Sequence, residues 1–94
     1  MTLTQDAAEA VALKALGWLA GHDELLPVFL GATGASEADL RDGLQDPDFL
    51  ASVLDFLLMD DAWILQFADA AEIAPERILQ ARQALPGGAE PHWT

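Results

Sequence analysis

The sequence predicts an all-α fold, a compact bundle of about six short helices. Alanine and leucine, both strong helix formers, are abundant, whereas β-branched residues are scarce. Apolar residues recur at helical spacing, and glycine, proline and capping residues divide that pattern into short segments. A chain of 94 residues holds one core. We therefore expect residues 1–88 to form a single helical domain and residues 89–94 to form a C-terminal tail.

Capping residues define the first three helices. Thr4 is the expected N-terminal cap of a helix over residues 5–20. Gly21 follows this helix, at the position where a helix often ends in left-handed backbone geometry. A second helix is expected from Asp23 to about Thr33, ending at Gly34, with Pro27 in its first turn because proline lacks the N–H that a later position needs. Ser36 and Asp39 resemble a capping box, which predicts a short third helix to about Leu44.

The fourth helix is predicted to be central. Asp46 followed by Pro47 is a start signal, and the helix is expected to run to about Met59. Its apolar residues cover most of the circumference: Phe49, Leu50, Val53, Leu54, Phe56, Leu57 and Leu58. A helix that is apolar nearly all round is largely buried, so the other helices should pack around this one.

Two further helices complete the bundle. Asp60 and Asp61 break the apolar run and cap a fifth helix through Ala71, with Trp63, Ile64, Phe67, Ala68 and Ala71 on one face. Pro75 begins the sixth helix, which is expected to stop at Pro86-Gly87-Gly88.

A shift of thirty-eight residues aligns the two halves of the chain in pattern. Leu16 then falls on Leu54, Leu19 on Leu57, and Phe29 on Phe67. One interpretation is a duplication, with two three-helix halves related by a pseudo-two-fold axis. The other is that any two amphipathic helical segments can be brought into apolar register. The sequence leaves both open.

The charge balance excludes several partners. Sixteen acidic residues against four basic ones give a net charge of −12, and the whole cationic supply is Lys14, Arg41, Arg77 and Arg82. Nucleic-acid backbones and anionic membranes are bound through clustered Lys and Arg, so we expect neither as a ligand. Cysteine is absent, which removes disulfides, thiolate nucleophiles and soft metal sites.

The chain predicts no membrane span. The apolar run from Phe49 to Met59 is eleven residues long and contains Asp55, whereas a spanning helix needs about 20 apolar residues. The apolar N-terminal stretch carries Asp6 and Glu9 where a signal peptide carries basic residues. We therefore expect a cytoplasmic protein.

The candidate chemical sites are better explained as structural features. Asp55, Asp60 and Asp61 could form a carboxylate site for a metal-dependent enzyme, but helix capping at a tight turn accounts for the aspartates. The segment Gly31–Gly34 could be a phosphate-binding nest, but no lysine follows it, and an interhelical turn is the favoured interpretation. His22 and His92 have no serine or cysteine nucleophile at a motif spacing. We expect no catalytic residue, cofactor, metal or small-molecule substrate.

Four aromatic residues are the candidate interaction residues. Trp93 and His92 stand beyond a Pro-Gly-Gly stretch that no core needs, and they are expected to dock on the protein's own groove, a second copy or a partner. Trp18 and Trp63 lie on helices already rich in apolar residues. Apolar surface left over on so small a domain favours self-association or a partner.

Three stretches also carry a resemblance to a known family: Leu25 to Gly34, Asp46 to Trp63, and Ala84 to Gly88 continuing through His92-Trp93-Thr94. They resemble a family of small uncharacterised alphaproteobacterial proteins, a domain of unknown function. The resemblance implies a bacterial cytoplasmic protein with a natural C-terminal tail, and it transfers no catalytic residue.

The sequence therefore predicts a small acidic, non-enzymatic protein-interaction module that self-associates, in its simplest form as a homodimer. The alternative from another class is an acidic DNA-mimic decoy, which would require carboxylates such as Asp39, Asp42, Asp46 and Asp48 to form a row on one face.

Overall fold

Six α-helices and no strand make up the part of the chain that the structure, a computed structural model, describes, residues 3–86. The all-α prediction is confirmed. The helices are α1 (Gln5–Ala20), α2 (Leu25–Thr33), α3 (Glu37–Asp42), α4 (Pro47–Leu57), α5 (Asp61–Ala71) and α6 (Glu76–Ala84), and a 3-10 turn, η1 (Gly43–Gln45), joins α3 to α4. The radius of gyration, 12.4 Å, is that of one compact domain of this length.

Short polar side chains begin four of the six helices, as the sequence predicts. The Thr4 side chain accepts a hydrogen bond from the backbone N–H of Ala7 at the start of α1. At the start of α4 the Asp46 side chain accepts from the Asp48 N–H, and at the start of α5 the Asp60 side chain accepts from the Ala62 N–H. At the start of α3, Ser36 and Asp39 form the complete capping box, each side chain accepting from the other's backbone N–H. These bonds satisfy backbone donors that have no partner within the helix.

Several helix ends differ from the sequence-based expectation, among them the end of α4, which lies at Leu57 and was expected near Met59. Residues 23–24 form a turn, so α2 begins at Leu25, and Pro27 still lies in its first turn. The third helix is α-helical only to Asp42 and then tightens into η1. Gly21 is not left-handed; its φ is −92°, and its N–H donates to the carbonyls of the last turn of α1.

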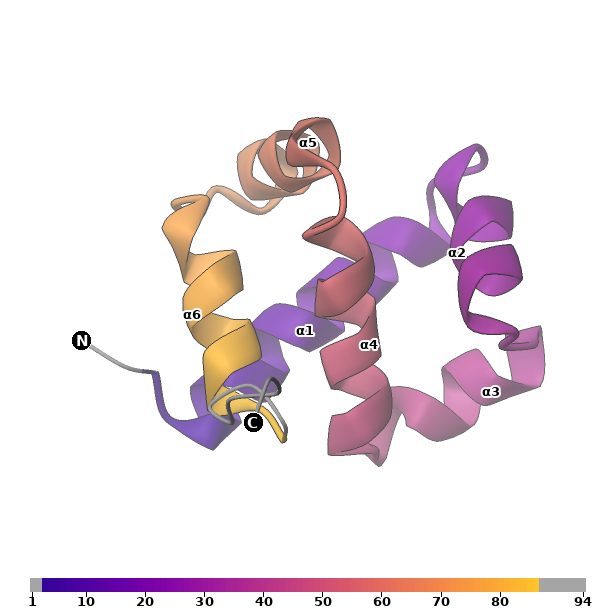
Figure 1. Ribbon diagram of the computed structural model, residues 1–94, viewed down its shortest axis with the longest axis horizontal. Coiled ribbons are helices and arrows are strands. Elements are labelled where there is room, and N and C mark those ends of the chain that lie inside the picture. The colour runs from indigo at the N-terminus through magenta and orange to yellow at the C-terminus, as the bar shows by residue number, and fades with distance from the viewer. Residues whose placement is uncertain (1–2, 87–94) are drawn as a thin grey trace, which may run out of the picture.

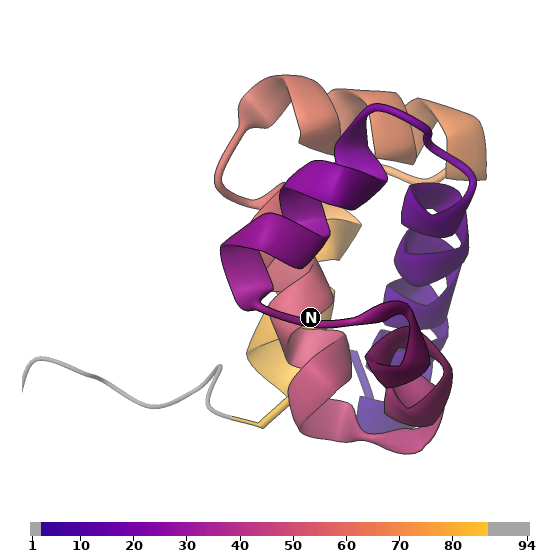
Figure 2. The ribbon, with the colours of Figure 1, turned by 90° about the vertical axis from the view of Figure 1, so that its right-hand side faces the viewer.

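The core is one cluster, and α1 and α4 together occupy its centre. Six of the eleven residues of α4 are buried, which confirms that this helix is largely buried. However, α1 also contacts α2, α4, α5 and α6, so the central position is shared (Figure 1). Three fully buried alanines on α1, Ala8, Ala12 and Ala15, leave room for its neighbours to pack closely. In Figure 2, α5 lies across one end of the α1–α4 pair.

The two halves of the chain agree in burial at some positions under the thirty-eight-residue shift and differ at others. Ala12, Ala15, Leu16 and Leu19 on α1 are buried, and the residues that follow each by thirty-eight on α4 are buried as well. Phe29 on α2 and its counterpart on α5, Phe67, are also buried. The order of three helices is the same in each half. Other pairs differ, since Leu25 is buried and its counterpart Trp63 only half-buried, so burial leaves both interpretations of the repeat open.

Candidate functional site

The two described tryptophans pack against the core. The Trp63 ring stacks on Phe56 of α4, with centroids 4.6 Å apart and planes 19° apart, so this tryptophan packs on the fourth helix. The Trp18 ring lies 5.8 Å from Phe67 and meets His22 edge-on at 5.1 Å. Both tryptophans are half-buried. His92 and Trp93 lie outside the described residues.

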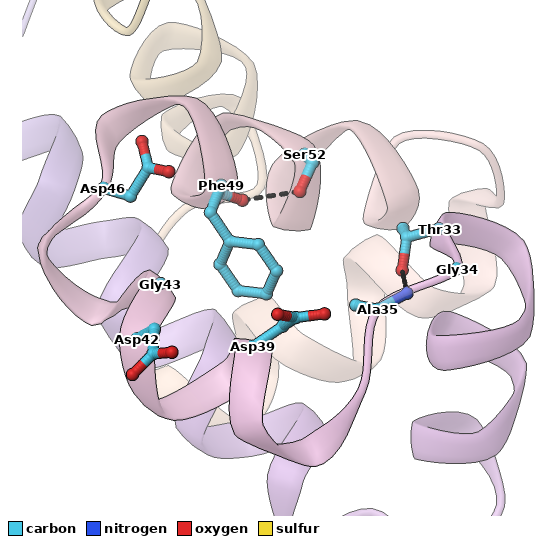
Figure 3. Close-up of a pocket in the computed structure, with 9 residues that line it drawn as sticks. All are labelled: Thr33, Gly34, Ala35, Asp39, Asp42, Gly43, Asp46, Phe49 and Ser52. Carbon is cyan, nitrogen blue, oxygen red and sulfur yellow. Dashed lines mark hydrogen bonds between the residues drawn. The ribbon is translucent and has the colours of Figure 1, made fainter.

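Three aspartates of the predicted acidic row gather at one pocket. Asp39, Asp42 and Asp46 line a hollow of about 350 Å³ between α3, η1 and the start of α4, and Figure 3 shows them around the Phe49 ring. The fourth aspartate of the proposed row, Asp48, does not line it. The sequence thus brings three of the four carboxylates to one place.

Most polar groups of this acidic pocket are bound to nearby backbone. Asp39 Oδ2 accepts from the Ser36 N–H at 2.9 Å, and Asp46 Oδ1 accepts from the Asp48 N–H at 3.0 Å. Ser52 Oγ donates to the Phe49 carbonyl, and Thr33 Oγ1 donates to the Phe29 carbonyl. Two of the carboxylates that give this pocket its negative charge, those of Asp39 and Asp46, therefore also stabilise the starts of helices.

The candidate phosphate nest is an interhelical turn. Gly31 and Thr33 belong to the last turn of α2, and Gly34 ends that helix with a left-handed φ of 72°. Its N–H donates to the Leu30 carbonyl at 2.9 Å. The segment therefore lies at a helix C-terminus, where the dipole repels an anion.

The carboxylates considered for catalysis do not form a joint site. Asp55 accepts from Arg82 on α6, Asp60 caps α5, and Asp61 lines a groove between α5 and α6. Across residues 3–86, no three histidine, aspartate or glutamate side chains gather closely enough to hold a metal ion. His22 Nδ1 accepts from the Leu25 N–H at 3.2 Å, which makes it a helix-start residue.

An apolar groove opens between α5 and α6. Both helices pack on α1 and α4 more closely than on each other. The groove between them has a volume of about 440 Å³ and is lined by Leu58, Asp61, Ile64, Leu65, Pro75, Glu76 and Leu79; we call it the α5–α6 groove. Leu65 and Leu79 are 59% and 50% exposed, so the domain leaves these side chains without a full partner. No local sequence pattern indicates this groove, because its residues come from different helices.

A second apolar surface lies on α1, α3 and η1. It is a hollow of about 240 Å³ lined by Leu13, Leu16, Gly17, Ala20, Leu40, Arg41 and Leu44; we call it the α1–α3 face. Leu13 and Leu44 are 40% and 45% exposed. None of the described residues that line it is acidic, which is unusual in a chain at −12.

No helix among residues 3–86 combines the length and apolar character needed to cross a membrane.

The comparisons with known proteins identify a family and no individual relative. Neither a curated protein nor a solved structure matches the chain. One family model matches residues 5–88, a span that includes all six helices and both apolar surfaces. The chain therefore belongs to the family described as Protein of unknown function (DUF3572).

Proposed function

We propose that this protein is a non-enzymatic protein-interaction module that self-associates as a homodimer through the α1–α3 face. The observation that carries the proposal is the combination of exposed Leu13 and Leu44 with an absence of carboxylates among the described lining residues. Two copies at −12 repel each other, so the contact is most favourable where acidic groups are fewest.

Arg41 adds a polar contact to this surface. It lines the α1–α3 face, and the one ion pair among residues 3–86 joins two other residues, Arg82 and Asp55. Arg41 is therefore available to bind a carboxylate of the second copy that lies at the edge of the contact, outside the residues that line this face. A charged side chain at the rim of an apolar contact favours correct orientation more than affinity.

Gly17 gives the proposal a sharp test. It lies inside α1, where glycine costs about 1 kcal/mol relative to alanine. A Cβ at this position would meet nothing within 4 Å, so the folded chain itself does not require glycine there. A close-packed second copy would explain it, because glycine lets two backbones approach.

The test compares Gly17→Ala with Gly31→Ala by sedimentation equilibrium over a range of concentrations. Gly31 is a matched control, since it also lies in a helix with open space around its Cα. Both variants are expected to raise the free energy of unfolding by about 0.5–1 kcal/mol. Only Gly17→Ala should weaken dimerisation, by about tenfold. A wild-type protein that stays monomeric at high concentration would remove the self-association proposal.

The acidic decoy remains the second candidate, and the gathering of Asp39, Asp42 and Asp46 at one pocket favours it. Such a decoy would occupy a basic nucleic-acid-binding protein, with affinity falling steeply as salt rises. Asp42→Asn is the informative variant, because Asp39 and Asp46 also cap helices. Competition with DNA for a basic DNA-binding protein, measured at several salt concentrations, would distinguish the decoy from the dimer.

The proposed setting is the cytoplasm of an alphaproteobacterium. Its support is the family membership together with the resemblance of the three sequence stretches quoted above. In this setting, Trp93 and His92 are additional candidate contacts for the partner surface. Immunodetection after cell fractionation of the source bacterium tests the compartment.

A further inference from the structure

We infer that the α5–α6 groove binds an amphipathic helix of a partner protein, one that carries an apolar stripe flanked by basic residues. The inference rests on the proposal that the protein is an interaction module, but not on its self-association. It concerns a different surface, built from different helices.

A second hollow adjoins the α5–α6 groove. This hollow of about 400 Å³ is lined by Leu65, Ala68, Asp69, Ile73 and Pro75. Leu65 and Pro75 line both hollows, so the two hollows adjoin at α5, and together they form the depression considered below. Ile64, Leu65 and Ala68 supply its apolar wall on α5, and Leu79 supplies the wall on α6. In Figure 1 these two helices diverge from the loop that joins them.

The charges around this depression have one sign. On α5, Asp61 lines one hollow and Asp69 lines the other, and Glu76, at the start of α6, lines the same hollow as Asp61. The two aspartates are eight positions apart on α5, which is about 12 Å along the helix axis. Arg77 follows Glu76 in the chain but lines neither hollow. The described groove thus has apolar walls, an acidic rim and no cation.

This charge pattern selects the occupant. A second copy of the chain would bring a net charge of −12 to an acidic rim, which opposes binding. A partner helix with leucine-like anchors at helical spacing, and lysine or arginine about eight residues apart beside them, would fill the apolar walls and neutralise both aspartates. Helix-in-groove binding uses such anchors at the spacing of successive turns.

The test is an NMR titration of the full-length ¹⁵N-labelled protein with a synthetic amphipathic helical peptide. The peptide has leucines along one face and two lysines about eight residues apart at the edges of that face. One control peptide has the same composition in scrambled order, and another has glutamates in place of the lysines. We expect saturable shifts confined to residues of α5, α6 and Leu58, with neither control peptide reproducing them.

Matched variants assign the binding to the groove. Leu65→Ser and Leu79→Ser should each weaken binding by about tenfold, whereas Leu44→Ser, similarly exposed but on the α1–α3 face, should leave it unchanged. Asp61→Asn should weaken binding several-fold, and Asp23→Asn, which makes the same charge change outside the groove, should not. Asp61 is not the cap of α5, so this variant keeps the helix start intact.

Four results would overturn the inference. Equal binding of the scrambled peptide would indicate attraction to the net charge alone. Equal loss with Leu44→Ser would place the site elsewhere. Groove signals that shift with protein concentration alone would assign the groove to a second copy. A change in the Trp93 indole signal on Leu65→Ser, without peptide, would assign it to the chain's own C-terminal tail. The sedimentation result for Gly17→Ala is independent of all four, so failure here is distinguishable from failure of the dimer.

Discussion

Arg82 Nε donates to Asp55 Oδ1 at 2.6 Å, a contact that joins α6 to α4 across twenty-seven residues of chain. It is the one ion pair among residues 3–86. The Arg82 side chain is 17% exposed, and its Nη1 also donates to the Pro86 carbonyl at 3.0 Å. Asp55, which the sequence suggested as a candidate catalytic carboxylate, thus forms an ion pair with Arg82 that links two helices.

Replacing Arg82 with alanine should destabilise the fold by about 1 kcal/mol. The loss combines a partly exposed ion pair, the hydrogen bond to Pro86 and the packing of the arginine stem. Arg77→Ala is the control, because it removes the same charge from an exposed position on the same helix. Urea denaturation measures both. Equal destabilisation by the two variants would mean that net charge, and not the contact with Asp55, sets the effect.

Gly43→Ala should be more damaging, by about 2–3 kcal/mol. A Cβ on the buried Gly43 would overlap the Phe49 ring, with Cγ only 2.5 Å away. Because Cγ lies near the root of that side chain, the ring cannot simply rotate aside. Phe49 also meets Phe29 edge-on, with centroids 6.1 Å apart, so its displacement would disturb the core beside α2.

A double-mutant cycle checks the cause of this destabilisation. Phe49→Ala removes the obstructing ring, so adding Gly43→Ala in that background should cost much less than it does in the wild-type protein. Strict additivity of the two changes, measured by chemical denaturation, would contradict the overlap as the cause.

Helix positions could be predicted from the sequence because their signals are local. The Ser36–Asp39 capping box and the cap from Asp46 to Asp48 each involve residues at most three positions apart, so residue types alone indicate them. The 3-10 turn after Asp42 was missed, since it depends on how η1 packs against α4. The central role of α1 was also missed, because alanine is common on both buried and exposed helix faces.

The apolar surfaces could not be predicted, because exposure of a leucine depends on the arrangement of whole helices. Leu54 is fully buried while Leu65 is 59% exposed, yet both occur in similar helical patterns. The α5–α6 groove also joins Leu65 to Leu79, fourteen residues apart on different helices. The sequence offered tryptophans as candidate contacts, but Trp18 and Trp63 direct much of their surface against the core.

Two left-handed helix ends should respond to substitution with opposite signs. Gly34 ends α2 with φ 72°, and Glu72 ends α5 with φ 57°. Gly34→Ala should cost about 1 kcal/mol, whereas Glu72→Gly should stabilise by a similar amount, about 1 kcal/mol, by relieving backbone strain and removing an acid from a helix C-terminus. Glu72→Gln isolates the charge contribution. If Glu72→Gln stabilised as much as Glu72→Gly, the backbone contribution would be absent. Thermal and urea denaturation measure all three.

Asp60 tests whether capping accounts for the aspartates between α4 and α5. Its Oδ1 accepts from the Ala62 N–H at 2.8 Å, while Asp61 is the first residue of the helix and does not make this bond. Asp60→Ala should therefore cost about 1 kcal/mol, and Asp60→Asn only a few tenths, since asparagine caps as well as aspartate. Asp61→Ala keeps the cap and should cost less than Asp60→Ala, because only its favourable contact with the helix dipole is lost. Urea denaturation of the three variants gives the order. If Asp60→Asn were as destabilising as Asp60→Ala, the negative charge of Asp60, and not its hydrogen bond to Ala62, would be what this turn requires.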